Sequence, residues 1–211
     1  MCDTLGVIYK GREKGMNKWK DEFATDQTCR TVQEAIIGAD CFIGLSSGNL
    51  LTADHVSQMA PKPIIFAMAN PTPEISPDEA RKGSPHAIVA TGRSDYPNQI
   101  NNCMCFPFLF RGTLDVGAKC INEEMKMAAA LALAELAREP VPKEVERAYG
   151  GKKFEFGIDY IVPTPFDSRL LFKIPKAVAI AAMESGVATK KITDWDEYDH
   201  ILKIRTLKTS W

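Results

Sequence analysis

The stretch Ile64-Ile65-Phe66-Ala67-Met68-Ala69-Asn70-Pro71-Thr72-Pro73-Glu74 decides the fold of this chain. Its apolar first half is typical of a strand that is buried on both faces, as in a parallel sheet. Pro71 and Pro73 remove two backbone donors, so the strand must end near Asn70. Asn70 therefore stands at the carboxyl end of a buried strand, which is where ligands bind in open α/β sheets. The alternative is an asparagine that only caps the following turn.

Similar apolar runs recur along the first half of the chain, with helix signals between them. Strands separated by helices of this length pair in parallel through right-handed crossovers. We therefore predict an α/β fold: a Rossmann-like parallel sheet with helices on both faces, incomplete at its amino-terminal end and followed by carboxyl-terminal helices. Strands are expected at residues 6–9, 41–45, 64–69 and 87–92. Helices are expected at residues 31–37 and 52–59, and from residue 76 onward.

The second half of the chain has the pattern of a helical region. Apolar residues recur three and four positions apart and predict one long helix over residues 114–137. An extended piece is expected at residues 154–162 and a helix at residues 175–184. A further amphipathic helix is predicted in the tail by Trp195, Tyr198, Ile201, Leu202 and Ile204.

The composition excludes several classes of partner. Among 211 residues, 26 Lys and Arg balance 27 Asp and Glu, which gives a net charge of -1. Such a chain has no overall attraction to nucleic acid or to an anionic membrane. No apolar run approaches the ~20 residues of a membrane span. The six cysteines lie mostly in apolar surroundings and indicate buried thiols of a reducing compartment, so we expect the cytoplasm or the interior of an organelle.

Small and amide residues follow three of the expected strands. Because the carboxyl ends of parallel strands lie side by side, these segments should line one crevice. Small side chains let a flat ligand approach the backbone, and Ser and Asn supply orienting hydrogen bonds. The Asn101-Asn102 pair, close before an apolar segment, adds donors and acceptors at the mouth of this predicted ligand site. The three strand ends are Gly44-Leu45-Ser46-Ser47-Gly48, Ala69-Asn70-Pro71-Thr72 and Thr91-Gly92-Arg93-Ser94.

The phosphate-binding turn of a dinucleotide-binding fold is absent from the sequence. No G-x-G occurs, and hence no G-x-G-x-x-G. Asp3 nevertheless stands where an acid ends the second strand of such a fold. That acid normally accepts hydrogen bonds from the ribose hydroxyls of the cofactor. The alternative is an acid in a frayed terminus. The sheet is therefore expected to begin in the middle of the usual fold.

Several segments together resemble the carboxyl-terminal cofactor domain of malic enzymes, specifically the bacterial-type small form. The central motifs are Asn70-Pro71-Thr72-Pro73-Glu74 and the stretch from Ala90 to Asn102. Residues 3–12, the helix from Gly112 onward and residues 160–167 match that domain as well. The resemblance is weakest in the tail. It implies a partial NAD(P)-binding domain at residues 1–193 and a helical tail at residues 194–211.

The resemblance implies an activity and a set of contacts. Malic enzymes oxidise (S)-malate at C2, pass the hydride to NAD or NADP and release CO2 to give pyruvate, with Mg²⁺ or Mn²⁺ in the complete enzyme. It implies substrate contacts from Asn70 and Asn102. It implies no catalytic acid, base or metal ligand in this chain, because those groups are expected upstream of Met1, and hence no activity of the chain alone. Cofactor contacts are implied for Asp3, Gly44, Ser46, Ser47, Asn70, Asn101 and Asn102.

The choice of cofactor stays open at this point. The basic residues that follow Asp3 are either attracted to the 2′-phosphate of NADP or form a solvated loop, whereas Asp3 itself favours NAD. The resemblance also implies a homo-oligomer. Two other classes remain as alternatives: a different α/β NAD(P)-dependent dehydrogenase, which requires a G-x-G-x-x-G, and a non-catalytic relic or interaction module. The basic cluster consists of Lys10, Arg12, Lys14, Lys18 and Lys20, with Tyr9 beside it.

Two smaller motifs, a pair of cysteines and an acid close to an arginine, do not predict a functional site. Cys103 and Cys105 do not predict a zinc site, which needs four ligands. Asp167 and Arg169 are expected to form a local ion pair that contributes little if it is exposed.

Overall fold

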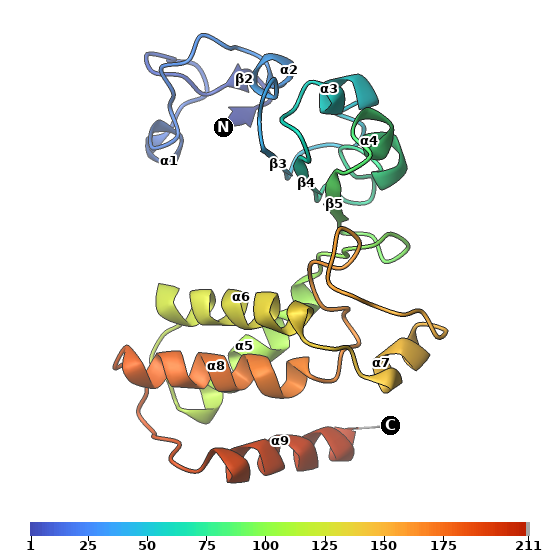
Figure 1. The fold of residues 1–211 in the computed structure, drawn as a ribbon. Coiled ribbons are helices and arrows are strands. Elements are labelled where there is room, and N and C mark those ends of the chain that lie inside the picture. The colour runs from blue at the N-terminus through green and yellow to red at the C-terminus, as the bar shows by residue number, and fades with distance from the viewer. Residues whose placement is uncertain (210–211) are drawn as a thin grey trace. The chain divides into compact units, whose positions relative to one another are not determined.

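The computed structural model describes residues 1–209, which divide after Gly92 into two compact units. The first unit, residues 1–92, holds all the strands of the described chain, and the second unit begins at Arg93 and is helical (Figure 1). The tail from residue 194 is grouped with the second unit. Among the described residues, none of the helices is both long enough and apolar enough to cross a membrane.

The first unit is built on a parallel sheet of three strands, β3 (Cys41–Gly44), β4 (Ile64–Ala67) and β5 (Ile88–Thr91), in that order. The register places Gly44 opposite Ala67, and Ala67 opposite Thr91. The carboxyl ends of the three strands therefore lie side by side, as the sequence predicts. The α/β class and the parallel pairing are confirmed.

Helices cover the face of this sheet that carries Ile65, Ala67 and Val89. These helices are α3 (Ala53–Ser57) and α4 (Pro77–Gly83), whereas α2 (Val32–Ala35) contacts β2 (Gly6–Val7) and is followed by the core residue Ile36. All three helices begin where the sequence predicts, and the side chains of Thr31, Thr52 and Ser76 cap them by accepting from the backbone N–H three residues later. On the other face of the sheet, apolar side chains such as Ile43 remain exposed, so the helical cover within this unit lies on one side.

The amino-terminal strand expected at residues 6–9 is not part of the parallel sheet. Instead, β1 (Cys2–Asp3) and β2 (Gly6–Val7) form a separate antiparallel pair, followed by the short helix α1 (Lys18–Asp21). Gly6 makes the tight turn possible, because its φ is +101° and a Cβ there would lie 2.2 Å from the Arg30 carbonyl oxygen. The prediction failed because the apolar run is too short to show its pairing partner.

The second unit is a helical bundle around a core that includes Met125, Leu136, Leu170 and Ile174. Figure 1 shows α6 and α8 running side by side. Its elements are η1 (Asn102–Met104), α5 (Phe106–Asp115), α6 (Glu123–Arg138), α7 (Lys143–Ala148), α8 (Leu170–Glu184) and α9 (Trp195–Thr209).

The single long helix predicted over residues 114–137 is wrong. Two helices, α5 and α6, stand there, separated by a turn in which Gly117 has a φ of +54°. The turn ends at Asn122, whose side chain accepts from the Met125 N–H and starts α6. The helix predicted at residues 175–184 begins earlier, at Leu170, because the buried stripe continues through Leu170 and Ile174. The extended piece at residues 154–162 is reduced to one bridge, Gly157 to Tyr160.

The predicted tail helix is confirmed as α9, and its inner side chains Tyr198 and Leu202 are buried. Asp115, at the end of α5, holds this helix. Its carboxylate accepts from the Tyr198 hydroxyl at 2.9 Å and from Arg205 Nη1 at 2.8 Å, and from Arg111 within α5. A buried carboxylate with this many donors stays ionised.

Acid is expected to loosen α9 only at low pH. Burial raises the pKa of Asp115, but hydrogen bonds from Arg111, Arg205 and Tyr198 outweigh it, so the net pKa is lowered. The stabilisation is therefore fully present above the ordinary carboxyl pKa and is lost as the pH falls through the lower, folded value. We expect the protection factors of the α9 amides, which are corrected for the intrinsic pH dependence of exchange, to be unchanged between about pH 7 and pH 5 and to fall only below the ordinary carboxyl pKa. In the Asp115→Asn variant, the α9 amides should exchange faster than in the unmodified chain already at neutral pH. Equal protection of α9 in the variant and in the unmodified chain would contradict this account.

Candidate functional site

Asn70 lies where the opening motif predicts it. It follows the buried Ala69 beyond the end of β4, and its own side chain is exposed. The Asn70–Pro71 peptide bond is cis. The helix that follows the motif, α4, is capped by Ser76 and not by Asn70. Asn70 is thus a polar side chain presented to solvent at the carboxyl edge of a parallel sheet, a position suited to ligand contact.

Glu74, at the end of the same motif, is fully buried beneath this edge. Its Oε1 accepts from the Ser46 backbone N–H at 2.9 Å and from the Ser46 hydroxyl at 3.3 Å. Its Oε2 accepts from the Ala69 N–H at 3.0 Å. The carboxylate therefore joins the loop after β3 to the residue directly before Asn70. This role was not predicted from the sequence, where Glu74 reads only as the acid that closes the turn.

Two glycines in the loop after β3 allow the loops to approach this closely. A Cβ on Gly44 would lie 2.4 Å from Glu74 Cδ, and a Cβ on Gly48 would lie 2.7 Å from Thr72 Cβ. Neither position has room for a side chain. Gly44 itself is buried, while Ser46 and Ser47 are exposed at the edge. At Gly44 the small residue is therefore required by contact with another part of the protein, the Glu74 carboxyl group.

Asp3 lies in β1 and is surrounded by cations. Its carboxylate accepts from Arg12 Nη2 at 2.8 and 2.7 Å and from Lys20 Nζ at 2.6 Å. The hydrogen bonds from Arg12, and then those from Lys20, hold the pKa of Asp3 far below its ordinary value. Arg12 is itself buried and also donates to backbone carbonyls, whereas Lys20 is partly exposed. Two cations around one carboxylate give the cluster of Asp3, Arg12 and Lys20, the corner around Asp3, a net positive charge.

The amides of the motif at residues 98–102 divide into buried and exposed groups. Asn98 is buried, and its side chain donates to the Ile158 carbonyl at 2.7 Å and accepts from the Ile161 N–H at 2.9 Å. Asn101 Oδ1 accepts from the Cys103 N–H and starts η1. Asn102 is exposed. Asn98 therefore fixes the segment around residue 160, and Asn101 and Asn102 are the amides of this motif that face solvent.

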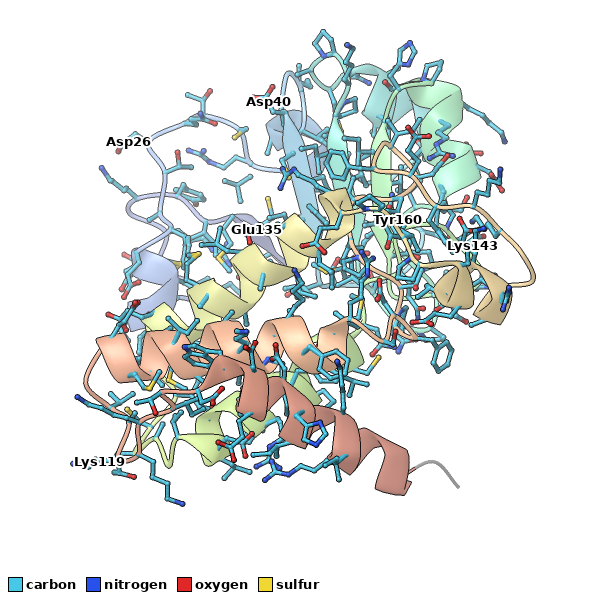
Figure 2. All side chains as sticks on the ribbon, turned by 60° about the horizontal axis from the view of Figure 1, so that its bottom comes forward. Asp26, Asp40, Lys119, Glu135, Lys143 and Tyr160 are labelled. Atoms are coloured by element: carbon cyan, nitrogen blue, oxygen red, sulfur yellow. The ribbon has the colours of Figure 1, made fainter. Side chains whose placement is uncertain are left out.

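The distal segment, residues 160–167, is anchored from within the second unit. Figure 2 shows Lys143 on α7 and Tyr160 in the loop that follows that helix. Tyr160 is buried, and burial raises its pKa to about 12. Asp167 is also buried and makes a bidentate pair with Arg169, with distances of 2.9 Å to Nε and 2.6 Å to Nη2. The expected local pair is present, but its burial makes it more than a surface contact.

The described residues offer no ready-made metal site. Among residues 1–209, no three or more His, Cys, Asp or Glu side chains are grouped so that they would hold an ion. The expectation of buried thiols is wrong, because none of the six cysteines is buried. All are free; Cys41, Cys103 and Cys120 are exposed, and Cys2, Cys29 and Cys105 are partly buried.

A parallel sheet with helices between its strands, and with glycine, serine and asparagine at its carboxyl edge, makes this an α/β protein with a candidate ligand site at that edge. The chain belongs to the malic enzymes: the family model "Malic enzyme, NAD binding domain" matches residues 1–148. The family resemblance seen in the sequence is thereby confirmed.

Individual relatives agree with this assignment. The chain is 57% identical to the NADP-dependent malic enzyme of Rhizobium meliloti over 97% of its own length and 27% of that protein. It is 53% identical to the NAD-dependent malic enzyme of the same organism over 93% of its own length and 26% of that protein. The crystal structure of Entamoeba histolytica malic enzyme matches with a TM-score of 0.81 and 34% identity, covering 98% of this chain and 41% of that one. The chain thus spans about a quarter of the length of these two curated relatives.

Proposed function

We propose that this chain is the cofactor-binding part of a malic enzyme that converts (S)-malate and NAD(P)⁺ to pyruvate, CO2 and NAD(P)H. The observation that carries the proposal is Asn70, exposed at the carboxyl end of β4 in a member of this family. We propose that Asn70 and Asn102 each bind malate. Further contacts to the cofactor are proposed for Asp3, Gly44, Ser46, Ser47, Asn70, Asn101 and Asn102.

The proposed role of these side chains is orientation. The amide of Asn70 offers two N–H donors and one acceptor oxygen, which suit a malate carboxylate and a hydroxyl or carboxamide. An amide does not titrate near neutral pH, so Asn70 and Asn102 hold the reactants and transfer no proton. Hydride transfer from C2 of malate to the nicotinamide ring requires both to be held in contact, and correct placement contributes much of the rate. Asn101 uses its oxygen as a helix cap, so its NH2 group is what remains for a ligand.

The divalent cation of the reaction supplies charge stabilisation at the malate oxygen when bound. The described residues of this chain contain no set of ligands for it. The acid and the base are likewise proposed to lie outside this chain. The contribution of this chain is then to bind and align, and the activity of the whole enzyme stays a proposal.

A chimera tests the proposed function. This chain replaces the matched segment of the Rhizobium meliloti NADP-dependent malic enzyme, to which it is 57% identical. We expect malate-dependent reduction of NADP with one pyruvate formed for each NADPH. A folded chimera that reduces no cofactor in the presence of malate and Mn²⁺ would contradict the proposal.

We further propose that the corner around Asp3 favours NADP. An acid at this position usually accepts from the ribose hydroxyls and repels a 2′-phosphate. Here the Asp3 carboxylate is already bound by Arg12 and Lys20, which leaves a net positive charge that attracts a phosphate. Placing this chain in both Rhizobium meliloti enzymes, one named NADP-dependent and one NAD-dependent, should give two chimeras that both prefer NADP. Chimeras that keep the preferences of their hosts would refute this.

Lys20→Ala is expected to weaken NADP selectively. Lys20 is the more exposed of the two cations at Asp3 and so the one able to reach a ligand. Its loss should raise KM for NADP about tenfold and change KM for NAD less than about twofold. Lys10→Ala is the matched control, because Lys10 is a nearby exposed lysine that pairs with Asp26 instead. An equal rise in KM for both cofactors would count against a phosphate contact.

We also propose a homo-oligomer in the cytoplasm or an organelle interior. Exposed apolar side chains such as Ile43, Leu45 and Leu114 supply surface for association, and free cysteines suit a reducing compartment. Light scattering on the chimera would report the assembly directly, and a monomer at micromolar concentration would exclude it.

A further inference from the structure

We propose that Glu74 is a positioning residue: its carboxylate fixes the loop that carries Ser46 relative to the loop that carries Asn70. The inference rests on the proposed function of these two side chains and extends it to a residue that touches neither malate nor cofactor. Glu74 is completely buried, so direct contact with a ligand is excluded. Its effect must pass through the groups that it binds.

The donors around Glu74 require a carboxylate. Three donors face it: the N–H and hydroxyl of Ser46 and the N–H of Ala69. A buried charge is expensive unless hydrogen bonds compensate it, and here both oxygens are occupied. A glutamine has the same size but only one acceptor oxygen. Its NH2 group would face a backbone N–H on one of the two loops, and that connection would be lost.

The loops are in contact at the level of the backbone, so a shift in one is passed to the other. Gly44 leaves room for the carboxylate, and Gly48 leaves room for Thr72, where added Cβ atoms would overlap their neighbours. Two backbone hydrogen bonds connect the same loops, from the Asn49 N–H to the Pro73 carbonyl and from the Leu51 N–H to the Glu74 carbonyl, both at 3.0 Å. Of these connections, the Glu74 carboxylate is the one nearest to Asn70, because it binds the N–H of Ala69, the residue directly before Asn70.

This location makes the spacing of Ser46 and Asn70 sensitive to one buried side chain. A misplacement of about 1 Å is enough to slow a reaction by about a hundredfold. Loss of one bridge should therefore appear in the kinetics of a folded enzyme and not only in its stability.

The test is Glu74→Gln in the chimera that carries this chain. We expect kcat/KM for malate, per folded enzyme, to fall by about tenfold or more, with KM for the cofactor raised as well. Glu79→Gln is the matched control, because Glu79 lies on the adjacent helix α4 and its side chain is partly exposed in a pair with Lys82. The control should keep the kinetic constants of the parent. A lower melting temperature of Glu74→Gln with kinetic constants equal to those of the parent would overturn the proposal.

A second variant and a second measurement cover the case in which Glu74→Gln does not fold. Glu74→Asp keeps the charge and withdraws it by one methylene, so it should show the same kinetic loss in a milder form. In the unmodified full chain, the Ser46 amide should exchange its hydrogen about a hundredfold more slowly than the equally exposed Ser47 amide. Equal exchange rates would show that the bridge is absent and would also overturn the proposal. An unmodified chimera without activity would instead refute the proposed function, leaving the exchange result to judge the bridge.

Discussion

Replacing Asn70 with alanine is expected to lower kcat/KM for malate by about a hundredfold in the chimera, with a smaller effect on KM for NADP. Asn70 is exposed at the carboxyl end of β4, and the backbone N–H before it is held by the buried Glu74. Such a side chain is free to bind a ligand and contributes little to packing. The melting temperature should therefore stay within a few degrees of the parent value, which separates a loss of binding from a loss of structure.

The control for Asn70 is Gln33→Ala, which removes another exposed side-chain amide from the same unit. Gln33 lies on α2, the helix before β3, and so it is not at the carboxyl end of a strand of the parallel sheet. It should leave kcat/KM for malate unchanged. If Asn70→Ala keeps kcat/KM within about threefold of the parent, Asn70 does not hold the substrate.

Asp167→Asn is expected to reduce the free energy of unfolding by about 3 kcal/mol, because it removes the bidentate charge partner of a largely buried guanidinium. The Glu139 carboxylate, 3.9 Å from Arg169 Nη1, is too distant to replace it. The Asp167 side chain has no exposed surface, and the Arg169 side chain is 14% exposed. Arg169 also donates to the Pro140 carbonyl at 3.0 Å, so the pair ties the start of α8 to the segment after α6. Urea unfolding of the full chain, followed by the helical circular dichroism signal, measures the change.

A matched exposed pair provides the control for Asp167. Arg93 and Asp95 have the same separation in sequence and make the same bidentate contact, at 2.8 and 2.6 Å. Their side chains are 44% and 55% exposed. Asp95→Asn should therefore change the free energy of unfolding far less than Asp167→Asn does. Equal losses for both variants would show that burial of the Asp167 pair contributes nothing.

The three parallel strands and the helices α2, α3 and α4 of the first unit were predictable because their signals are local. The apolar run before Asn70, and the caps Thr31, Thr52 and Ser76, each lie within a few residues of the structure that they determine. Gly117 was also a local signal for the break between α5 and α6. The helical spacing on both sides of it hid the break, because Leu114, Ala118 and Ile121 continue the apolar steps of four and three across the turn.

The role of Glu74 was not predictable, because its partner Ser46 is 28 residues away in the sequence. Only the folded sheet shows that Gly44 leaves room for its carboxylate. The same holds for Asn98, which the sequence groups with Asn101 and Asn102 although it is buried against the segment around residue 160. A run of amides shows that polar groups are present, and tertiary packing decides which of them face a ligand.

Asp3 shows how a predicted contact can leave the chemistry undecided. The sequence predicts an acid that accepts the ribose hydroxyls, and it also shows a basic cluster nearby. It does not show that Arg12 and Lys20 converge on the carboxylate of Asp3. The charge around Asp3, and with it the proposed preference for NADP, follows from that convergence.

The most direct test of this account is a crystal structure of the chimera with malate, Mg²⁺ and NADPH, a combination that cannot transfer hydride. The account predicts the Asn70 side-chain amide within about 3 Å of a malate oxygen or of the nicotinamide carboxamide. Clear density for both ligands, with the Asn70 side chain turned toward solvent and making no contact to either, would contradict it.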